Sequence, residues 1–192
     1  LGKYFVIEEN SEITFEANPE TVDLSEWQLY RESGFNRVSI GVQSLQENEL
    51  KSCGRIHSPQ KALEAVVGAQ KAGFERINVD LMFGIPEQTF DSFQRTVGEV
   101  LALPIEHLSI YGLQIEEGTV FSSWEEQGKL ILPSEETVVQ MYDWLLEYLP
   151  ANGFGRYEIS NFANPGGESR HNLKYGHYQP YLGVGSGACG FD

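Results

Sequence analysis

Apolar residues recur through the first two-thirds of the chain in two alternating patterns. Amphipathic segments predict helices that begin at Asp23 or Ser25, at Pro59 and at Phe90. Between them lie strand-like runs, which are Glu12–Ala17, Arg37–Val42, Arg76–Met82 and Glu106–Tyr111. Strands that alternate with helices pair in parallel and form βαβ units. The pattern therefore predicts an α/β fold, either a partial (β/α) barrel or part of an open doubly wound sheet.

The last third of the chain has a different pattern. Its predicted elements are a mostly looped segment over 114–133 with a short strand at Lys129–Leu132, a helix from Ser134 to about Leu149, and a strand at Arg156–Phe162. Residues 164–190 are rich in Gly, Tyr and polar side chains, which favours an ordered binding loop. We therefore expect a partial barrel over residues 1–113 and an α+β extension over residues 114–192.

Composition narrows the class of protein. The chain has 192 residues, of which 41% are hydrophobic and 21% charged, values typical of a globular domain. A formal charge of −15 argues against a nucleic-acid partner. No apolar run is long enough to cross a bilayer, and no targeting segment is recognisable. The two cysteines, Cys53 and Cys189, are too few to hold an iron–sulfur cluster and are typical of reduced cytosolic thiols, so we expect a cytoplasmic protein.

Four polar residues stand at predicted strand ends or in an adjacent loop: Glu16, Gln43, Asp80 and Arg55. The carboxyl ends of barrel strands converge on one mouth, so these side chains could meet there. Carboxylates accept hydrogen bonds from ribose hydroxyls, and a guanidinium binds an amino-acid carboxylate in a bidentate manner. The set would suit a small zwitterionic ligand that carries a sugar. The alternative is that these groups only cap the sheet or pair with neighbouring loops.

The sequence around these residues favours the ligand site. Long segments resemble, in the same order, segments of radical S-adenosylmethionine (SAM) proteins of the HemN/HemW group. These segments are ITFEANPETVD (13–23), GFNRVSIGVQS (34–44), GRIHS (54–58), INVDLMFGIPEQT (77–89) and HLSIYGLQIEEGTVF (107–121). The group includes oxygen-independent coproporphyrinogen III dehydrogenases and related haem chaperones. The resemblance extends from about residue 12 to residue 191.

This resemblance implies a role for each of the four polar residues. Glu16, Gln43, Arg55 and Asp80 match the SAM-binding glutamate, glutamine, arginine and aspartate of the group. Our own assignment gives the ribose to the two carboxylates and the methionine carboxylate to Arg55. The resemblance also implies a [4Fe–4S] cluster on a CxxxCxxC motif. We expect that motif, with a GGGTP-like strand end, before residue 1, so the chain is interpreted as an internal fragment that binds no cluster by itself.

A second motif lies in the predicted binding loop. The residues from His171 to Tyr175, HNLKY, resemble the HNxxYW motif that the haem-chaperone branch of the group associates with haem binding. Imidazole is a common axial ligand of haem iron, so His171 is the candidate haem contact. Gly176 stands in place of the Trp of that motif, and Cys189 stands where relatives often carry His. The alternative is a loop histidine that is hydrogen-bonded to backbone.

Three functions follow from these features. The first is a haem chaperone, which binds SAM, a [4Fe–4S] cluster and haem and passes haem to an acceptor protein. The second is a coproporphyrinogen III dehydrogenase of porphyrin biosynthesis. The third is a non-catalytic binding module. The SAM residues are common to the first two functions, whereas the HNLKY segment favours the chaperone.

Overall fold

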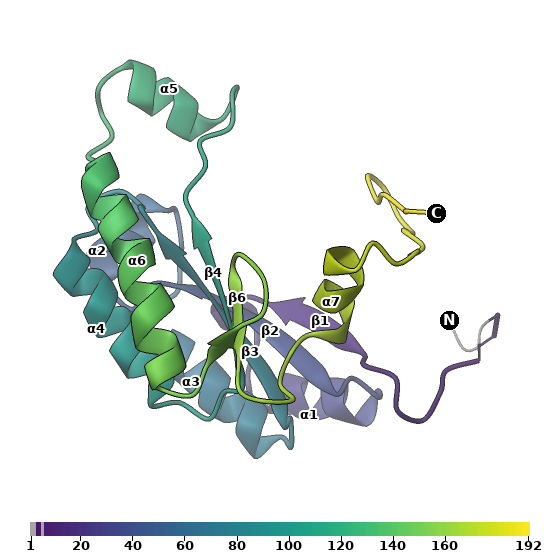
Figure 1. The fold of residues 1–192 in the computed structure, drawn as a ribbon. Helices are drawn as coiled ribbons and strands as arrows, with labels where there is room; N and C mark the ends of the chain where they lie inside the picture. The colour runs from purple at the N-terminus through teal and green to yellow at the C-terminus, as the bar shows by residue number, and fades with distance from the viewer. Residues whose placement is uncertain (1–2, 5) are drawn as a thin grey trace.

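The structure, a computed structural model, describes residues 3–4 and 6–192. Its core is a six-stranded sheet in the order β1-β2-β3-β4-β6-β5 (Figure 1). The strands are β1 (Thr14–Ala17), β2 (Arg37–Gln43), β3 (Arg76–Phe83), β4 (His107–Gly112), β5 (Gly155–Arg156) and β6 (Asn161–Ala163). β1 to β4 pair in parallel, and the hairpin β5–β6 adds to β4 in antiparallel fashion. The α/β class and the four parallel strands are confirmed, and the sheet continues through both segments, 1–113 and 114–192.

The long helices begin where capping residues predict them. The helices are α1 (Leu24–Glu32), α2 (Glu47–Ser52), α3 (Pro59–Lys71), α4 (Phe90–Leu101), α5 (Val120–Glu126), α6 (Glu135–Ala151) and α7 (Arg170–Gly176), with a short 3-10 turn, η1 (Pro19–Thr21). Asp23, rather than Ser25, caps α1 through a reciprocal capping box with Glu26. The Ser58 and Thr89 hydroxyls accept hydrogen bonds from the Lys61 and Ser92 amides at the starts of α3 and α4.

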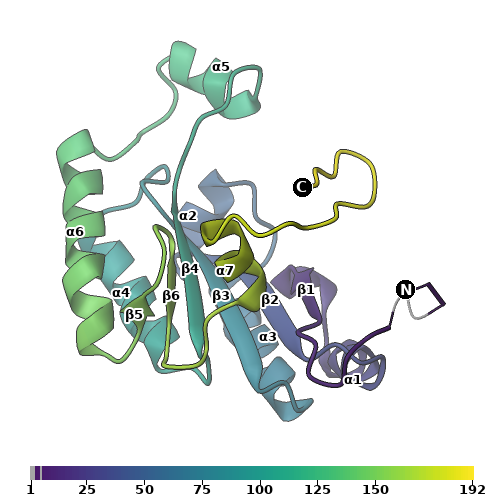
Figure 2. The same cartoon turned by 45° about the vertical axis from the view of Figure 1, so that its right-hand side comes forward.

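The apolar side chains of the strands and helices form one core. Val38, Ile40, Val79 and Leu108 are completely buried on the face of the sheet that meets the helices. Figure 2 shows α3 behind the strands and α7 in front of them, so α7 lies on the other face. No helix in the described part of the chain is long and apolar enough to cross a membrane.

Several expectations for the last third were wrong. Lys129–Leu132 is not a strand; it follows α5, a helix that the sequence pattern did not predict. The predicted strand Arg156–Phe162 is the hairpin β5–β6, because the chain turns back between its two short strands. The segment 164–190 is not all loop, since α7 carries the HNLKY residues with the Ser169 hydroxyl as its N-cap. In the first third of the chain, the sequence pattern also did not predict the short helix α2.

Candidate functional site

The face of the sheet opposite the helices is polar. Successive side chains of a strand point to opposite faces, so the apolar positions of β2 to β4 leave alternate residues on this second face. Three rows of aligned residues result: Thr14, Arg37 and Arg76; Glu16, Ser39, Asn78 and His107; and Gly41, Asp80 and Ser109. A face of this kind cannot belong to an apolar core and is suited to line a ligand site.

A cavity of about 670 Å³ opens on this polar face. Glu16 and Asp80 line it from β1 and β3, and His171 and Asn172 line it from α7. Arg37, Ser39, Asn78, Ser109 and Tyr111 complete most of its sheet side. The cavity thus brings two of the four SAM candidates together with the haem candidate.

Asp80 is fixed in place by its neighbours. The Ser39 hydroxyl donates to one carboxylate oxygen at 2.8 Å, and the Asn78 amide donates to the other at 2.7 Å. Burial raises the pKa of Asp80, and the nearby charge of Glu16 acts in the same direction, whereas the hydrogen bonds from Ser39 and Asn78 oppose the shift. The carboxylate is therefore preorganised, with lone pairs left to accept from a ligand hydroxyl.

Gln43 and Arg55 converge beside this cavity, around Gly41. A Cβ atom on Gly41 would lie 3.0 Å from Gln43 Nε2, 3.3 Å from Asn18 Oδ1 and 3.7 Å from Arg55 Nη2. Arg55 Nη1 also donates to Asn18 Oδ1 at 2.9 Å. The absence of a side chain at Gly41 therefore lets three polar side chains approach the strand closely, and Asn18 joins the predicted set.

Backbone geometry directs the Gln43 side chain toward Gly41. Gln43 has a φ of +66°, in the left-handed region, and the pairing of β2 with β3 shifts register between Gly41 and Gln43. A non-glycine residue in this conformation costs free energy and occurs preferentially at functional sites. The bulge at the end of β2 thus changes the direction of the Gln43 side chain.

A buried carboxylate, that of Glu49, holds the chain in place directly after Gln43. Glu49 on α2 has no exposed surface, and it accepts hydrogen bonds from Ser44 Oγ at 2.6 Å and from Ser92 Oγ at 2.5 Å. Gln88 Nε2 donates to the same carboxylate at 3.2 Å. Since Ser44 directly follows Gln43, Glu49 links the GVQS and PEQT segments and holds the strand end that presents Gln43.

The loop that carries Arg55 is held by His57. The His57 ring is buried, with Nδ1 3.1 Å from Glu20 Oε2 and Nε2 3.2 Å from the Val42 carbonyl oxygen. This connects the GRIHS loop to both η1 and the end of β2. The fold therefore positions the loop that carries Arg55.

A chain of hydrogen bonds joins Asp80 to α7. Asn78 Oδ1 lies 2.5 Å from His107 Nδ1, and His107 Nε2 lies 2.6 Å from the Tyr157 hydroxyl. Because Asn78 uses its amide nitrogen for Asp80, its oxygen accepts from His107 Nδ1–H, and His107 Nε2 then accepts from Tyr157. Asn172 Nδ2 donates to the Tyr157 hydroxyl at 3.3 Å. The Asn of the HNLKY segment is therefore connected to the SAM candidate Asp80.

His107 and Tyr157, the two titratable groups of this chain of hydrogen bonds, do not change protonation state near neutral pH. Burial, together with the charges of Arg37 and Arg76, lowers the pKa of His107 to about 3. Burial raises the pKa of Tyr157. His107 is accordingly a neutral imidazole and Tyr157 a protonated donor at neutral pH, as the hydrogen bonds require.

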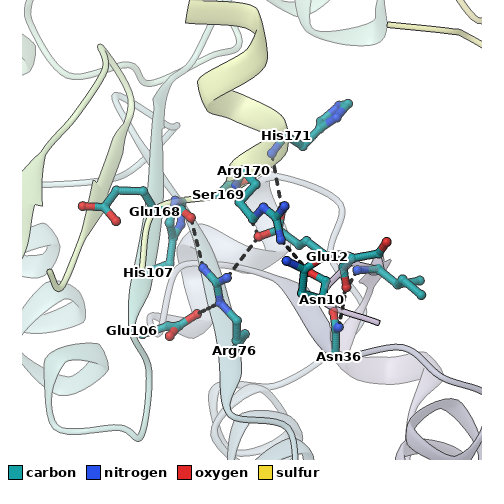
Figure 3. Close-up of polar contacts among 12 residues, drawn as sticks. Asn10, Glu12, Asn36, Arg76, Glu106, His107, Glu168, Ser169, Arg170 and His171 are labelled. Atoms are coloured by element: carbon teal, nitrogen blue, oxygen red, sulfur yellow. Dashed lines mark hydrogen bonds and ion pairs between the residues drawn. The ribbon is translucent and has the colours of Figure 1, made fainter. Parts of the chain in front are cut away.

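Ion pairs and hydrogen bonds hold α7 and the segment before β1 against the sheet (Figure 3). Arg76 contacts Glu106 at 2.8 Å and Glu12 at 3.3 Å, and it donates to the Glu168 carbonyl oxygen at 3.0 Å. Glu12 accepts in turn from the backbone amides of Arg170 and His171. Figure 3 shows the His171 imidazole pointing away from this network, so its ring remains available.

Sequence reasoning missed most of the supporting residues. Asn18, Ser39, Asn78 and His107 were not singled out, nor were Arg37, Glu49 and Tyr157. The signal for the strand residues is the period-two alternation of polar and apolar positions within β2, β3 and β4. Glu49 and Tyr157 carry no such signal, because their burial depends on contacts between distant segments.

The described residues do not fit an iron–sulfur cluster. Among residues 3–4 and 6–192, no three His, Cys, Asp or Glu side chains are grouped so that they could hold a metal ion. Burial raises the pKa of Cys53, which favours the thiol over the metal-binding thiolate. Cys189 is exposed and lies far along the chain from Cys53.

Comparisons with known proteins identify the family of the chain. The model of the Radical SAM superfamily matches residues 3–100. The chain is 39% identical over 181 residues to "Heme chaperone HemW" of Bacillus subtilis, covering 94% of this chain and 48% of that protein. It is 38% identical over 191 residues to "Heme chaperone HemW" of Lactococcus lactis, covering 100% of this chain and 50% of that protein. The chain thus spans about half the length of these relatives.

A solved structure shows the same fold. Coproporphyrinogen III oxidase (HemN) from Escherichia coli, described as a radical SAM enzyme, superposes with a TM-score of 0.81 at 23% identity, over 99% of this chain and 46% of that one. The partial-barrel expectation is therefore confirmed. Membership of the superfamily implies SAM and a [4Fe–4S] cluster as cofactors. The chain belongs to the radical SAM superfamily and, within it, to the HemN/HemW group.

Proposed function

We propose that the complete gene product is a radical SAM haem chaperone, and that this chain contributes its SAM pocket and a haem-contacting helix. The similarity to the HemW haem chaperones of Bacillus subtilis and Lactococcus lactis supports this function. The observation that carries it is the shared cavity. The SAM candidates Glu16 and Asp80 and the haem candidate His171 all line it.

In this proposal SAM lies across the strand ends, over the paired residues Asp80 and Gly41. Asp80 and Glu16 accept hydrogen bonds from ribose hydroxyls, and Arg55 pairs with the methionine carboxylate. Gln43 and Asn18 supply amide groups beside Arg55. The donor set fits the ligand, because an anionic end and a cationic end lie next to one another along the sheet edge. With a cluster bound, SAM supplies radical chemistry in this superfamily.

Haem is bound by α7 in this proposal. His171 is exposed at the first turn of the helix, and its imidazole packs edge-on against Tyr175 with ring centroids 4.7 Å apart. Such a histidine can reach an axial position on haem iron, and Tyr175 offers a flat contact surface. Haem is then passed to an acceptor protein. The expected cytoplasmic location belongs to this proposal as well.

Haem binding tests the proposal directly. The complete gene product is titrated with haem while the Soret absorption is recorded, first for the wild-type protein and then for His171→Ala. We expect His171→Ala to shift the Soret band and weaken binding. His177→Ala, at the exposed end of the same helix, is the matched control and should behave like wild type. Equal spectra for all three proteins would contradict the role of His171.

An activity assay with coproporphyrinogen III distinguishes the chaperone function from the dehydrogenase function. The same protein, with its cluster reconstituted, is incubated with coproporphyrinogen III, SAM and a reductant. The chaperone proposal predicts no protoporphyrinogen. Formation of protoporphyrinogen at a rate that depends on Asp80 would replace the proposal with the dehydrogenase function.

A further inference from the structure

Two arginines stand side by side at the start of β2 and β3 and differ sharply in their partners. Arg37 and Arg76 are aligned in the parallel pairing of these strands. Arg76 forms ion pairs with Glu106 and Glu12 and donates a hydrogen bond to the Glu168 carbonyl oxygen. Arg37 is only 5% exposed, and its buried Nε has no hydrogen-bond partner among the residues that the structure describes.

The two carboxylates whose charges act on Arg37, those of Glu12 and Glu106, are already engaged. Glu106 pairs with Arg76, and Glu12 pairs with Arg76 while accepting two backbone amides from α7. No carboxylate oxygen of the described residues lies within the 4.0 Å that defines an ion pair with Arg37. A buried N–H without a partner is unfavourable, because it loses its hydrogen bond with water and gains none from the protein, so the Nε of Arg37 requires an explanation.

Arg37 lines the cavity on the polar face of the sheet. It lies at the end of the cavity nearest the strand starts, whereas Asp80 lies further along, in the row of Gly41. Arg37 thus lies at the end of the cavity away from Asp80, and the carboxylate of Glu12, which lines the same cavity, is engaged by Arg76 and by the backbone amides of α7. The geometry points to Arg37 as the residue that binds a carboxylate of a ligand lying in this cavity.

That carboxylate belongs to a side arm of the tetrapyrrole and not to SAM. Arg37 and Gly41 are four residues apart on an extended strand, which corresponds to roughly 13 Å at about 3.3 Å per residue. The methionine carboxylate of a SAM molecule held by Arg55 beside Gly41 is too distant to reach Arg37 at the same time. A porphyrin whose iron faces His171 carries propionates on its periphery that can extend toward the sheet. This inference rests on the proposed function.

Esterified haem tests the inference. The complete gene product is titrated with haem, with haem dimethyl ester and with SAM, using wild type, Arg37→Gln and Arg95→Gln. Arg95 is exposed on α4 and serves as the matched control. We expect Arg37→Gln to bind haem roughly ten- to a hundredfold more weakly, because one charge-assisted hydrogen-bonded pair is lost. Its affinity for the diester and for SAM should equal that of wild type, and its Soret maximum should not move.

Each alternative result of these titrations leads to a different conclusion. Equal haem affinities for wild type and Arg37→Gln would overturn the inference while leaving the haem proposal intact. Loss of SAM affinity alone would assign Arg37 to the SAM carboxylate and overturn the tetrapyrrole assignment. A wild-type protein that binds no haem would remove the proposed function together with this inference. In urea unfolding, Arg37→Gln should be at least as stable as wild type, and a marked loss of stability would identify Arg37 as a structural residue.

Discussion

His107 Nε2 lies 2.6 Å from the hydroxyl oxygen of Tyr157, and this contact joins β4 to the turn between β5 and β6. The imidazole is completely buried, and burial lowers its pKa to about 3. The hydrogen-bonded chain from Asn172 to Asp80 passes through this contact. Its direction requires a neutral ring that donates at Nδ1 and accepts at Nε2.

The neutral His107 makes stability depend on pH. In the unfolded chain the imidazole binds a proton near pH 6.5, whereas in the folded protein it does so only near pH 3. The unfolded state therefore holds more protons in this window, and the free energy of unfolding falls as pH is lowered through it. We expect a contribution of up to about 1.4 kcal/mol per pH unit.

The His107→Gln variant isolates this contribution. Urea unfolding of wild type and variant is compared at pH 6.5 and at about pH 5. Burial raises the pKa of Asp80 and of Glu106, which acts in the opposite direction, but both carboxyls are present in each protein and largely cancel in the difference. Wild type should lose more stability than the variant. Parallel pH profiles would contradict a buried neutral His107.

Glu49 should be essential for stability although it lies on a six-residue helix. Glu49→Ala leaves the buried Ser44 hydroxyl without its acceptor, whereas Ser92 Oγ and Gln88 Nε2 keep the carbonyl oxygens of Thr89 and Met82. An unsatisfied buried hydroxyl costs about 1–3 kcal/mol and two further buried hydrogen bonds are lost, so we expect a loss of about 2 kcal/mol or more in urea unfolding. Glu47→Ala, which removes an exposed partner of Lys51 from the same helix, should change stability by less than about 1 kcal/mol. Similar losses in both variants would contradict the assigned role of Glu49.

The absence of a side chain at Gly41 should be required for SAM binding. The Cβ atom of Gly41→Ala would meet Gln43, Asn18 and Arg55, so these side chains must shift. We expect SAM affinity, measured by calorimetry on the complete gene product, to fall roughly tenfold, or about 1.4 kcal/mol. Gly98→Ala on α4 meets no atom within 4 Å and should leave the affinity unchanged. An undiminished affinity in Gly41→Ala would argue against a ligand at this strand end.

Elements with strong local signals were predictable from the sequence. The helices that follow Asp23, Ser58, Thr89 and Ser134 begin at side-chain caps, and the four parallel strands carry clear apolar runs. The helices α2, α5 and α7 span six or seven residues, too few for an apolar period to be distinguished from a loop. The hairpin β5–β6 was misread because its two strands together have the length of one.

The candidate site was predictable only in part. Glu16 and Asp80 share the cavity with His171, as convergence at strand ends suggests, and Gln43 and Arg55 meet next to it at Gly41. The positive φ of Gln43 and the burial of Glu49 have no sequence signature, because tertiary contacts determine both. Arg37 has no sequence signature either, because the lack of a partner for its Nε among the described residues depends on which carboxylates Arg76 engages.

In the proposed function, SAM and haem occupy one continuous site between the strand ends and α7. It is tested by NMR of SAM labelled with ¹³C in its methyl group, bound to the complete gene product together with ferric haem. The paramagnetic iron should broaden the methyl resonance, whereas zinc protoporphyrin in the same position should not. Equal line widths with ferric haem and zinc protoporphyrin, with both ligands bound, would contradict a shared site.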